Sequence, residues 1–212
     1  MKHSAIELLS SQHIWKGTSS QPNTAAYTPS GFTNIDSQIE GWPLGNLIEI
    51  IPQQTGIGEL SILLPSLAHI SQNQQWILFA GPPHIPYAPG LAGLGIDISK
   101  IIVTQTNSLL DTGWCMEQAL KSGTLGAVIG WLPKINDQLI RRLQLTLDAQ
   151  KVLCAFFTKP SKTEKSNPTP WRIIVRRKNR KTLIDIRKRR GGGPINAIHI
   201  HDLLSKTCCG FA

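Results

Sequence analysis

Short apolar runs alternate with longer amphipathic stretches along most of this chain of 212 residues. The apolar runs predict buried strands at 46–51, 76–80, 101–104, 126–131 and 152–157. The stretches between them predict helices at 57–71, 87–94, 112–122 and 135–149. Strands that alternate with helices predict an α/β fold with a mainly parallel sheet that is covered on both faces.

The composition changes after residue 158. Residues 158–170 form a polar, proline-containing stretch, which is typical of a loop. Segments 171–177 and 181–190 then predict two strands joined by "KNR", a basic C-terminal β-hairpin at the edge of the sheet. Beyond them, the pattern predicts a weak amphipathic helix near 195–204.

We therefore predict three parts in the chain. Residues 1–29 comprise a short helix over 4–15 and a flexible linker rich in Ser, Thr, Pro and Asn. Residues 30–190 form the α/β core with its basic hairpin, and residues 191–212 form a tail hinged on glycines.

Positive charge is concentrated near the C-terminus. The formal net charge is +9, and the segment from Lys159 to Arg190 holds 13 Lys and Arg against Glu164 and Asp185. Such a region indicates a polyanionic partner, nucleic acid before membrane, although an acidic protein surface or solvent alone would suit the same charges. The candidate contact residues are Lys159, Lys162, Lys165, Arg172, Arg176, Arg177, Lys178, Arg180 and Lys181. Trp171 lies among them, either stacked on a base or packed at the sheet edge.

The stretch "LIEIIPQQTGIGELSILL" (47–64) has the strand–turn–helix order of a phosphate-binding loop. The pattern G-x-x-x-x-G-K-[ST] places Ile51 at its first glycine and Gly56 at its second. Ile57 then takes the lysine position and Gly58 the Ser/Thr position. Because the lysine and the magnesium-binding hydroxyl are both missing, we expect no nucleotide hydrolysis, no catalytic residue and no cofactor.

Three stretches together resemble the core of RecA-type recombinases over roughly residues 30 to 190. They are "SGFTNIDSQIEGWPLGNLIEIIPQQTGIGEL", "LAGLGIDISKIIVTQ" and "EQALKSGTLGAVIGWL". The resemblance implies a RecA-like P-loop NTPase-type fold. It places Trp131 where the Walker B carboxylate would stand and Pro83 where the water-activating glutamate would stand. It thus implies a degenerate nucleotide site and a protein that is not an enzyme.

Within that fold, "WILFAGPPHIPYAPGLAGLGIDISKIIV" and "VIGWLPK" resemble the SulA/ImuA group, and ImuA proteins in particular. The resemblance implies a non-catalytic accessory of the bacterial SOS DNA-damage response that supports error-prone translesion synthesis. Its implied partners are polymerase-complex proteins, the RecA recombinase and single-stranded DNA. The alternative is a SulA-type inhibitor of cell division that binds FtsZ, for which a strongly basic C-terminus is not needed.

A second candidate partner surface is the rigid loop "GPPHIPYAPG", whose prolines restrict the backbone before docking. Its candidate contacts are Pro82, Pro83, His84 and Tyr87, unless the loop simply caps the sheet. We expect Trp42 and Trp131 to pack near the vacated nucleotide site.

Metal binding and membrane insertion are not expected. Cys115 and Cys154 lie in apolar segments, and Cys208, Cys209, His199 and His201 have no metal-site spacing. No run of about 18 uncharged apolar residues occurs, so the sequence predicts a cytoplasmic protein without a membrane partner.

Overall fold

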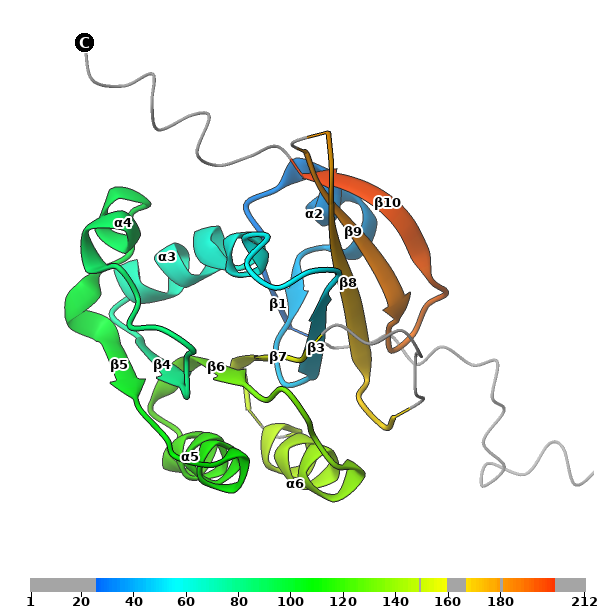
Figure 1. Cartoon of the computed structure of the whole chain (residues 1–212). Coiled ribbons are helices and arrows are strands. Elements are labelled where there is room, and N and C mark those ends of the chain that lie inside the picture. Colours follow the sequence, from blue (N-terminus) through cyan, green and yellow to red (C-terminus); the bar gives the residue numbers. More distant parts are fainter. Residues whose placement is uncertain (1–25, 149, 160–166, 180, 201–212) are drawn as a thin grey trace, which may run out of the picture.

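A computed structural model describes residues 26–148, 150–159, 167–179 and 181–200 of the chain (Figure 1). The helices in these residues are α2 (Thr33–Ile39), α3 (Leu64–Gln72), α4 (Ala88–Gly93), α5 (Leu109–Ser122) and α6 (Asp137–Leu147), with 3-10 turns η1 (Glu59–Ile62) and η2 (Ile98–Lys100). The strands are β1 (Tyr27–Thr28), β2 (Trp42–Pro43), β3 (Leu47–Pro52), β4 (Trp76–Ala80), β5 (Ile101–Thr104), β6 (Leu125–Trp131), β7 (Leu153–Phe157), β8 (Trp171–Lys178), β9 (Lys181–Lys188) and β10 (Ile195–Ile200). The predicted helix at 4–15 lies outside the described residues, and the division into three parts stays a prediction.

Eight strands form one mixed sheet in the order β10-β9-β8-β3-β7-β6-β4-β5. The six strands from β8 to β5 run parallel to one another, β9 pairs antiparallel with β8, and β10 pairs antiparallel with β9. The prediction of a mainly parallel α/β sheet is therefore confirmed. Strands β1 and β2 form a separate two-stranded ribbon.

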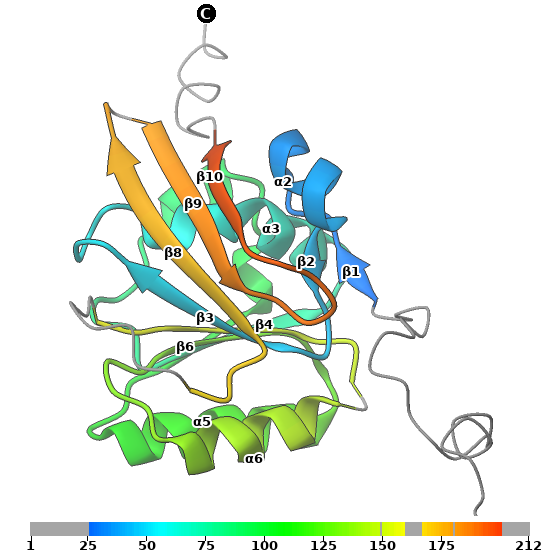
Figure 2. The ribbon, with the colours of Figure 1, turned by 90° about the vertical axis from the view of Figure 1, so that its right-hand side faces the viewer.

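Helices cover both faces of the sheet, as the continuously apolar strands predict. On one face, α3 packs against β4 and β6 and α2 against β10, with Ile48 and Ile50 of β3 in the same core, and on the other, α5 and α6 pack over Leu47, Cys154 and Phe156 (Figures 1 and 2). Alternate residues of a strand point to opposite faces, so β3 contributes to both cores. Figure 2 shows α5 and α6 side by side beneath the sheet.

Two helices begin at other residues than the pattern predicts. Helix α5 begins three residues before the predicted 112, since the Ser108 side chain accepts a hydrogen bond from the Asp111 N–H at 3.1 Å. The stretch predicted as helix from 57 contains the turn η1 first, and α3 begins only at Leu64.

Two predictions for the C-terminal region are wrong. Residues 195–200 form strand β10 and no helix, because Ile198 and Ile200 become buried when they pair with Ile184 and Thr182 of β9. This tertiary burial outweighs the weak helical pattern. The hairpin β8–β9 is consequently not the edge of the sheet, since β10 covers β9.

The predicted N-terminal linker also contains β1, which pairs with β2.

Among the described residues, no helix has the length and apolar character needed to cross a membrane.

The turn between α2 and β2 depends on Gly41. Its φ is 116°, and a Cβ atom there would lie 2.2 Å from the carbonyl oxygen of Thr28. Gly123 also has a positive φ, 66°, but a Cβ atom there would meet nothing within 4 Å. We expect Gly123→Ala to cost about 1 kcal/mol of unfolding free energy through backbone strain alone. Gly41→Ala should cost at least about 2 kcal/mol more, because the clash adds to the strain.

Chemical denaturation of both variants measures the difference directly. Equal losses for the two alanine variants would show that the approach of Thr28 to Gly41 does not constrain the fold.

Candidate functional site

A cleft of about 430 Å³ opens at the carboxyl edge of the parallel strands. In open α/β sheets this edge is where ligands bind, because the loops that follow successive strands surround one space. The lining residues come from the loops after β3, β4, β5, β6 and β7: Pro52, Thr55, Glu59, Gly81, Pro83, Thr106, Asn107, Ser108, Leu109, Thr112, Trp131, Pro133, Phe157, Thr158 and Lys159.

The turn after β3 borders this cleft but offers no positive charge that could bind a phosphate. Gly56 and Gly58 have φ values of 78° and 84°, the left-handed conformation that favours glycine. Ile57, at the lysine position of a phosphate loop, packs against the core, and the next side chain to line the cleft is the Glu59 carboxylate. A carboxylate at this place repels a triphosphate, and the absence of nucleotide hydrolysis stays a prediction.

Aromatic rings form the floor of the cleft. Trp131 stacks on Phe157 with ring centroids 5.3 Å apart and meets Phe79 edge-on at 5.8 Å. Such pairs are stable in apolar surroundings. Trp131 therefore lines the cleft, and its place at a vacated nucleotide site stays a prediction. Trp42 does not line the cleft, because it is fully buried in β2.

Some polar side chains on the cleft wall form hydrogen bonds within the protein, and others form none among the described residues. The hydroxyl groups of Thr106 and Thr112 are 2.7 Å apart, and the Thr112 hydroxyl donates to the Ser108 carbonyl oxygen at 3.0 Å. By contrast, the side chains of Asn107 and Lys159 form no hydrogen bond within the part of the chain that the structure describes, although both line the cleft.

The proline-rich loop after β4 has one residue in the lining of the cleft and others on the exposed surface beside it. Pro83 lines the cleft, whereas His84 and Tyr87 are exposed and Pro82 is buried. The structure thus brings Pro83, His84 and Tyr87 to the surface beside the cleft, and their contact with a partner stays a prediction.

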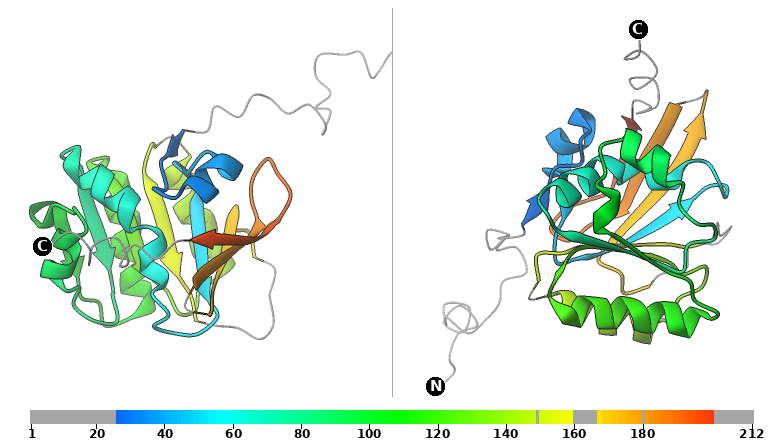
Figure 3. Two further views of the ribbon diagram at one scale, coloured as in Figure 1. Left: turned by 90° about the horizontal axis from the view of Figure 1, so that it is seen from above. Right: turned by 90° about the vertical axis from the view of Figure 1, so that its left-hand side faces the viewer.

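Exposed apolar side chains gather in the adjoining part of the chain, a feature that the sequence analysis missed. Ten large apolar side chains are exposed in the described residues, and nine of them lie between Trp76 and Trp114. We name these nine the apolar flank: Trp76, Ile85, Tyr87, Ile98, Ile102, Val103, Leu109, Leu110 and Trp114. They belong to β4, η2, β5, α5 and the segments that join them, and the right panel of Figure 3 shows the molecule from the side of α4 and β5. Ile85, Tyr87 and Leu109 follow the carboxyl ends of β4 and β5 at the cleft, and exposed apolar side chains at one site are typical of a protein–protein contact.

Some side chains of the basic C-terminal region are buried or form ion pairs within the fold. Trp171 is 2% exposed, so it packs in the core and cannot stack on a base. The buried Arg172 donates to Glu49 at 2.8 Å, and Arg176 pairs with Asp185 at 2.6 Å. Trp171 and Arg172 are therefore unsuited to the surface role that the sequence suggested for them, whereas the Arg176 side chain is 38% exposed and its contact with a polyanion stays a prediction.

The remaining candidates for polyanion contact are exposed or lie outside the described residues. Lys159, Arg177, Lys178 and Lys181 are exposed, and Arg177 donates a long hydrogen bond to the Ile57 carbonyl oxygen. Lys162, Lys165 and Arg180 lie outside the described residues.

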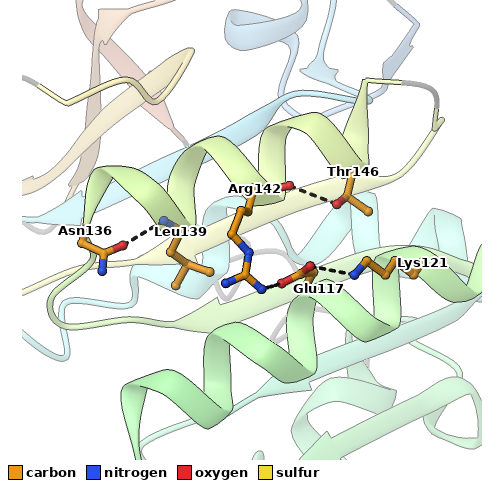
Figure 4. Close-up of polar contacts among 6 residues, drawn as sticks. All are labelled: Glu117, Lys121, Asn136, Leu139, Arg142 and Thr146. Carbon is orange, nitrogen blue, oxygen red and sulfur yellow. Dashed lines mark hydrogen bonds and ion pairs between the residues drawn. The ribbon is translucent and has the colours of Figure 1, made fainter.

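Helices α5 and α6 are joined by an ion cluster beside a second groove. Arg142 of α6 reaches the carboxylate of Glu117 on α5, which also accepts from Lys121 at 2.7 Å (Figure 4). The bond from Lys121, opposed by partial burial and reinforced by Arg142, holds the pKa of Glu117 below its ordinary value. The groove of about 380 Å³ is lined by Leu110, Asp111, Trp114, Asn136, Gln138, Leu139 and Arg142.

No metal site is indicated in the described ranges, where no three His, Cys, Asp or Glu side chains come together. Burial raises the pKa of the Cys154 thiol, which keeps it protonated as a core residue. His199 is exposed on β10, and His201, Cys208 and Cys209 fall outside the described residues.

Comparison with known proteins gives one consistent similarity. The family model "Cell division inhibitor SulA" matches residues 45–153, about half of the chain. The chain is 32% identical over 113 residues to the cell division inhibitor SulA of Yersinia pestis (strain Pestoides F), covering 53% of this chain and 66% of the relative. It is 29% identical over 125 residues to the protein of that name from Edwardsiella piscicida, covering 54% of this chain and 73% of the relative. The chain thus spans just under two thirds of the length of the Yersinia protein.

The Glu117 cluster predicts a pH dependence of stability. Because the pKa of Glu117 is lowered in the folded protein, its ionised form stabilises the fold at neutral pH. That contribution is lost as the pH falls below the ordinary value of 4.5 and through the lowered one. We therefore expect Glu117→Gln to destabilise the protein at neutral pH and to match the unaltered chain in strong acid.

Urea unfolding of both proteins across this pH range measures the difference. A deficit in Glu117→Gln that stays constant from neutral pH to strong acid would contradict a stabilising role of the carboxylate charge.

Proposed function

The chain belongs to the SulA family, and from this premise we propose that it inhibits cell division by binding FtsZ through a protein–protein interface, without catalysis. The relatives are named cell division inhibitors, which supports this activity. The setting that we propose is the SOS DNA-damage response, which the resemblance to the SulA/ImuA group implies.

The apolar flank is the observation that carries this proposal. All nine of its residues fall within the segment 45–153 that matches the family, whereas the basic hairpin lies beyond that segment. A function shared with the relatives should depend on the shared part of the chain. Apolar and aromatic side chains are also the ones that contribute most to the stability of protein interfaces.

An inhibitor of this kind needs a fold but no reaction. We infer that the fold derives from a RecA-like P-loop NTPase. The strand–turn–helix at β3 supports this origin, since two glycines in the left-handed conformation stand where a phosphate would be held. The loss of lysine at Ile57 and the carboxylate of Glu59 support the further inference that the nucleotide site is degenerate.

A second candidate function is an accessory role in translesion synthesis of the ImuA type, with contact to single-stranded DNA or to polymerase and recombinase proteins. The hairpin supports it with one observation. Lys178 and Lys181 lie directly opposite each other on β8 and β9, and both are exposed. Like charges in that position destabilise a hairpin, so a polyanion would relieve the repulsion.

The first proposal predicts that the apolar flank is needed for FtsZ binding. Tyr87 is 75% exposed in the flank, and Leu145 is 73% exposed on α6, outside it. We expect Tyr87→Ser to weaken binding of purified FtsZ about tenfold or more, because an exposed aromatic side chain at an interface contributes at least about 1.4 kcal/mol. The matched control Leu145→Ser should leave the affinity within about twofold.

Biolayer interferometry with the full chain gives both affinities, and inhibition of FtsZ polymerisation gives the functional readout. The proposal is wrong if Leu145→Ser weakens binding as much as Tyr87→Ser does.

The second candidate predicts salt-sensitive binding of a single-stranded oligonucleotide. Lys178→Glu should weaken it and lower the salt slope by at least about 0.7, since one phosphate contact is lost. Lys151→Glu carries the same change of charge at an exposed site before β7, and we expect it to bind like the unaltered chain. Fluorescence anisotropy at several salt concentrations measures both, and identical slopes would remove the hairpin from consideration.

A further inference from the structure

We propose that the cleft at the carboxyl edge is the anchor pocket of the partner-binding surface and receives one large apolar side chain of FtsZ together with the peptide group beside it. This inference rests on the proposed function and adds to it the place and the chemistry of the central contact.

The floor of the cleft suits an apolar side chain. One neighbour of Trp131 is Phe157, stacked against it, and the walls include the rings of Pro52, Pro83 and Pro133. These surfaces are flat and apolar, so an aromatic or branched aliphatic side chain would lose its water there at little steric cost. The volume of about 430 Å³ falls in the range of about 300–1,000 Å³ that is typical of ligand pockets.

The rim of the cleft suits a peptide group. The carboxamide of Asn107 offers both a donor and an acceptor, and a peptide group needs one of each. Thr55 adds a hydroxyl group, and neither of these side chains forms a hydrogen bond in the described ranges. Both can therefore bond to the main chain of an incoming segment without losing an internal partner.

The charges at the rim select against a phosphate ligand. The lining includes one ammonium, from Lys159, and one carboxylate, from Glu59, so the cleft carries no net positive charge. A nucleotide brings several negative charges and would meet the Glu59 carboxylate in the turn after β3. An uncharged group avoids that repulsion.

The cleft is continuous with the apolar flank, which identifies the occupant as part of the same partner. Leu109 belongs to both surfaces, since it lines the cleft and is exposed. Pro83 lines the cleft on the loop that also carries Ile85 and Tyr87. Energetically dominant contacts cluster in such pockets near the centre of an interface, surrounded by weaker contacts that exclude water.

Blocking the cleft tests the inference. Thr55→Trp places a bulky side chain at the rim, and Asn107→Ala removes the carboxamide without adding volume. Thr124→Trp is the matched control, because Thr124 is exposed in the turn before β6, at the opposite edge of the sheet. Thermal unfolding of each full-length variant checks that the fold is retained.

We expect Thr55→Trp to weaken FtsZ binding about tenfold or more and Asn107→Ala about threefold or more, as for residues at an interface centre. Thr124→Trp should bind like the unaltered chain. If the unaltered chain binds FtsZ and both cleft variants bind equally well, this inference is overturned and the proposed function stands. If the unaltered chain does not bind FtsZ, the proposed function fails and the inference with it.

A nucleotide-binding assay tests the alternative that the cleft binds a nucleotide. Equilibrium dialysis of the unaltered chain with ATP should detect no binding at micromolar concentrations. Binding of ATP that Thr55→Trp abolishes would overturn the inference in favour of a nucleotide pocket.

Discussion

The ion pair between Glu49 and Arg172 holds the two parts of this sheet in register. The residues lie directly opposite each other on β3 and β8, both are buried, and Asn167 donates a further hydrogen bond to the same carboxylate at 2.9 Å. Breaking such a pair leaves an uncompensated buried charge, which costs about 3–5 kcal/mol, so a slip of β8 by one residue is strongly disfavoured. The position of β8 in turn fixes where β9 and β10 add to the sheet and where the hairpin ends.

The pairing of β3 with β8 leaves two surfaces of different chemistry on opposite sides of one sheet. The apolar flank lies on the β5 side, in the segment shared with the cell division inhibitors, and the exposed lysines of the hairpin lie on the β8–β9 side, beyond it. The carboxyl ends of the parallel strands form the cleft between them. The loops at this edge can therefore serve as a binding surface without any change of strand order. We infer that this edge derives from a phosphate-binding site, because Gly56 stands at the second glycine position of the loop pattern, whereas Ile51 and Ile57 replace its first glycine and its lysine.

The sequence predicted the parallel body well because its strands are continuous apolar runs, as in β6 and β7. It failed for β10 because the burial of Ile198 depends on β9, a long-range contact that periodicity does not record. It also overestimated the basic surface, since Arg172 resembles an exposed cation until its buried partner, Glu49, is known. The apolar flank left a signal that was used only in part: the sequence analysis named Tyr87 as a candidate contact, but not Ile85, which stands among the same prolines, where no strand or helix could bury it.

Hydrogen exchange of the full chain with and without FtsZ, followed by mass spectrometry, tests the location of the interface most directly. We predict slower exchange on addition of FtsZ in residues 76–114 and in the turn after β3, with β8 and β9 unchanged. The same segments should respond because the unpaired edge of β5 and the loops around the cleft would lose solvent on binding. Protection confined to β8 and β9, with residues 76–114 unaffected, would contradict an inhibitor that acts through its apolar flank.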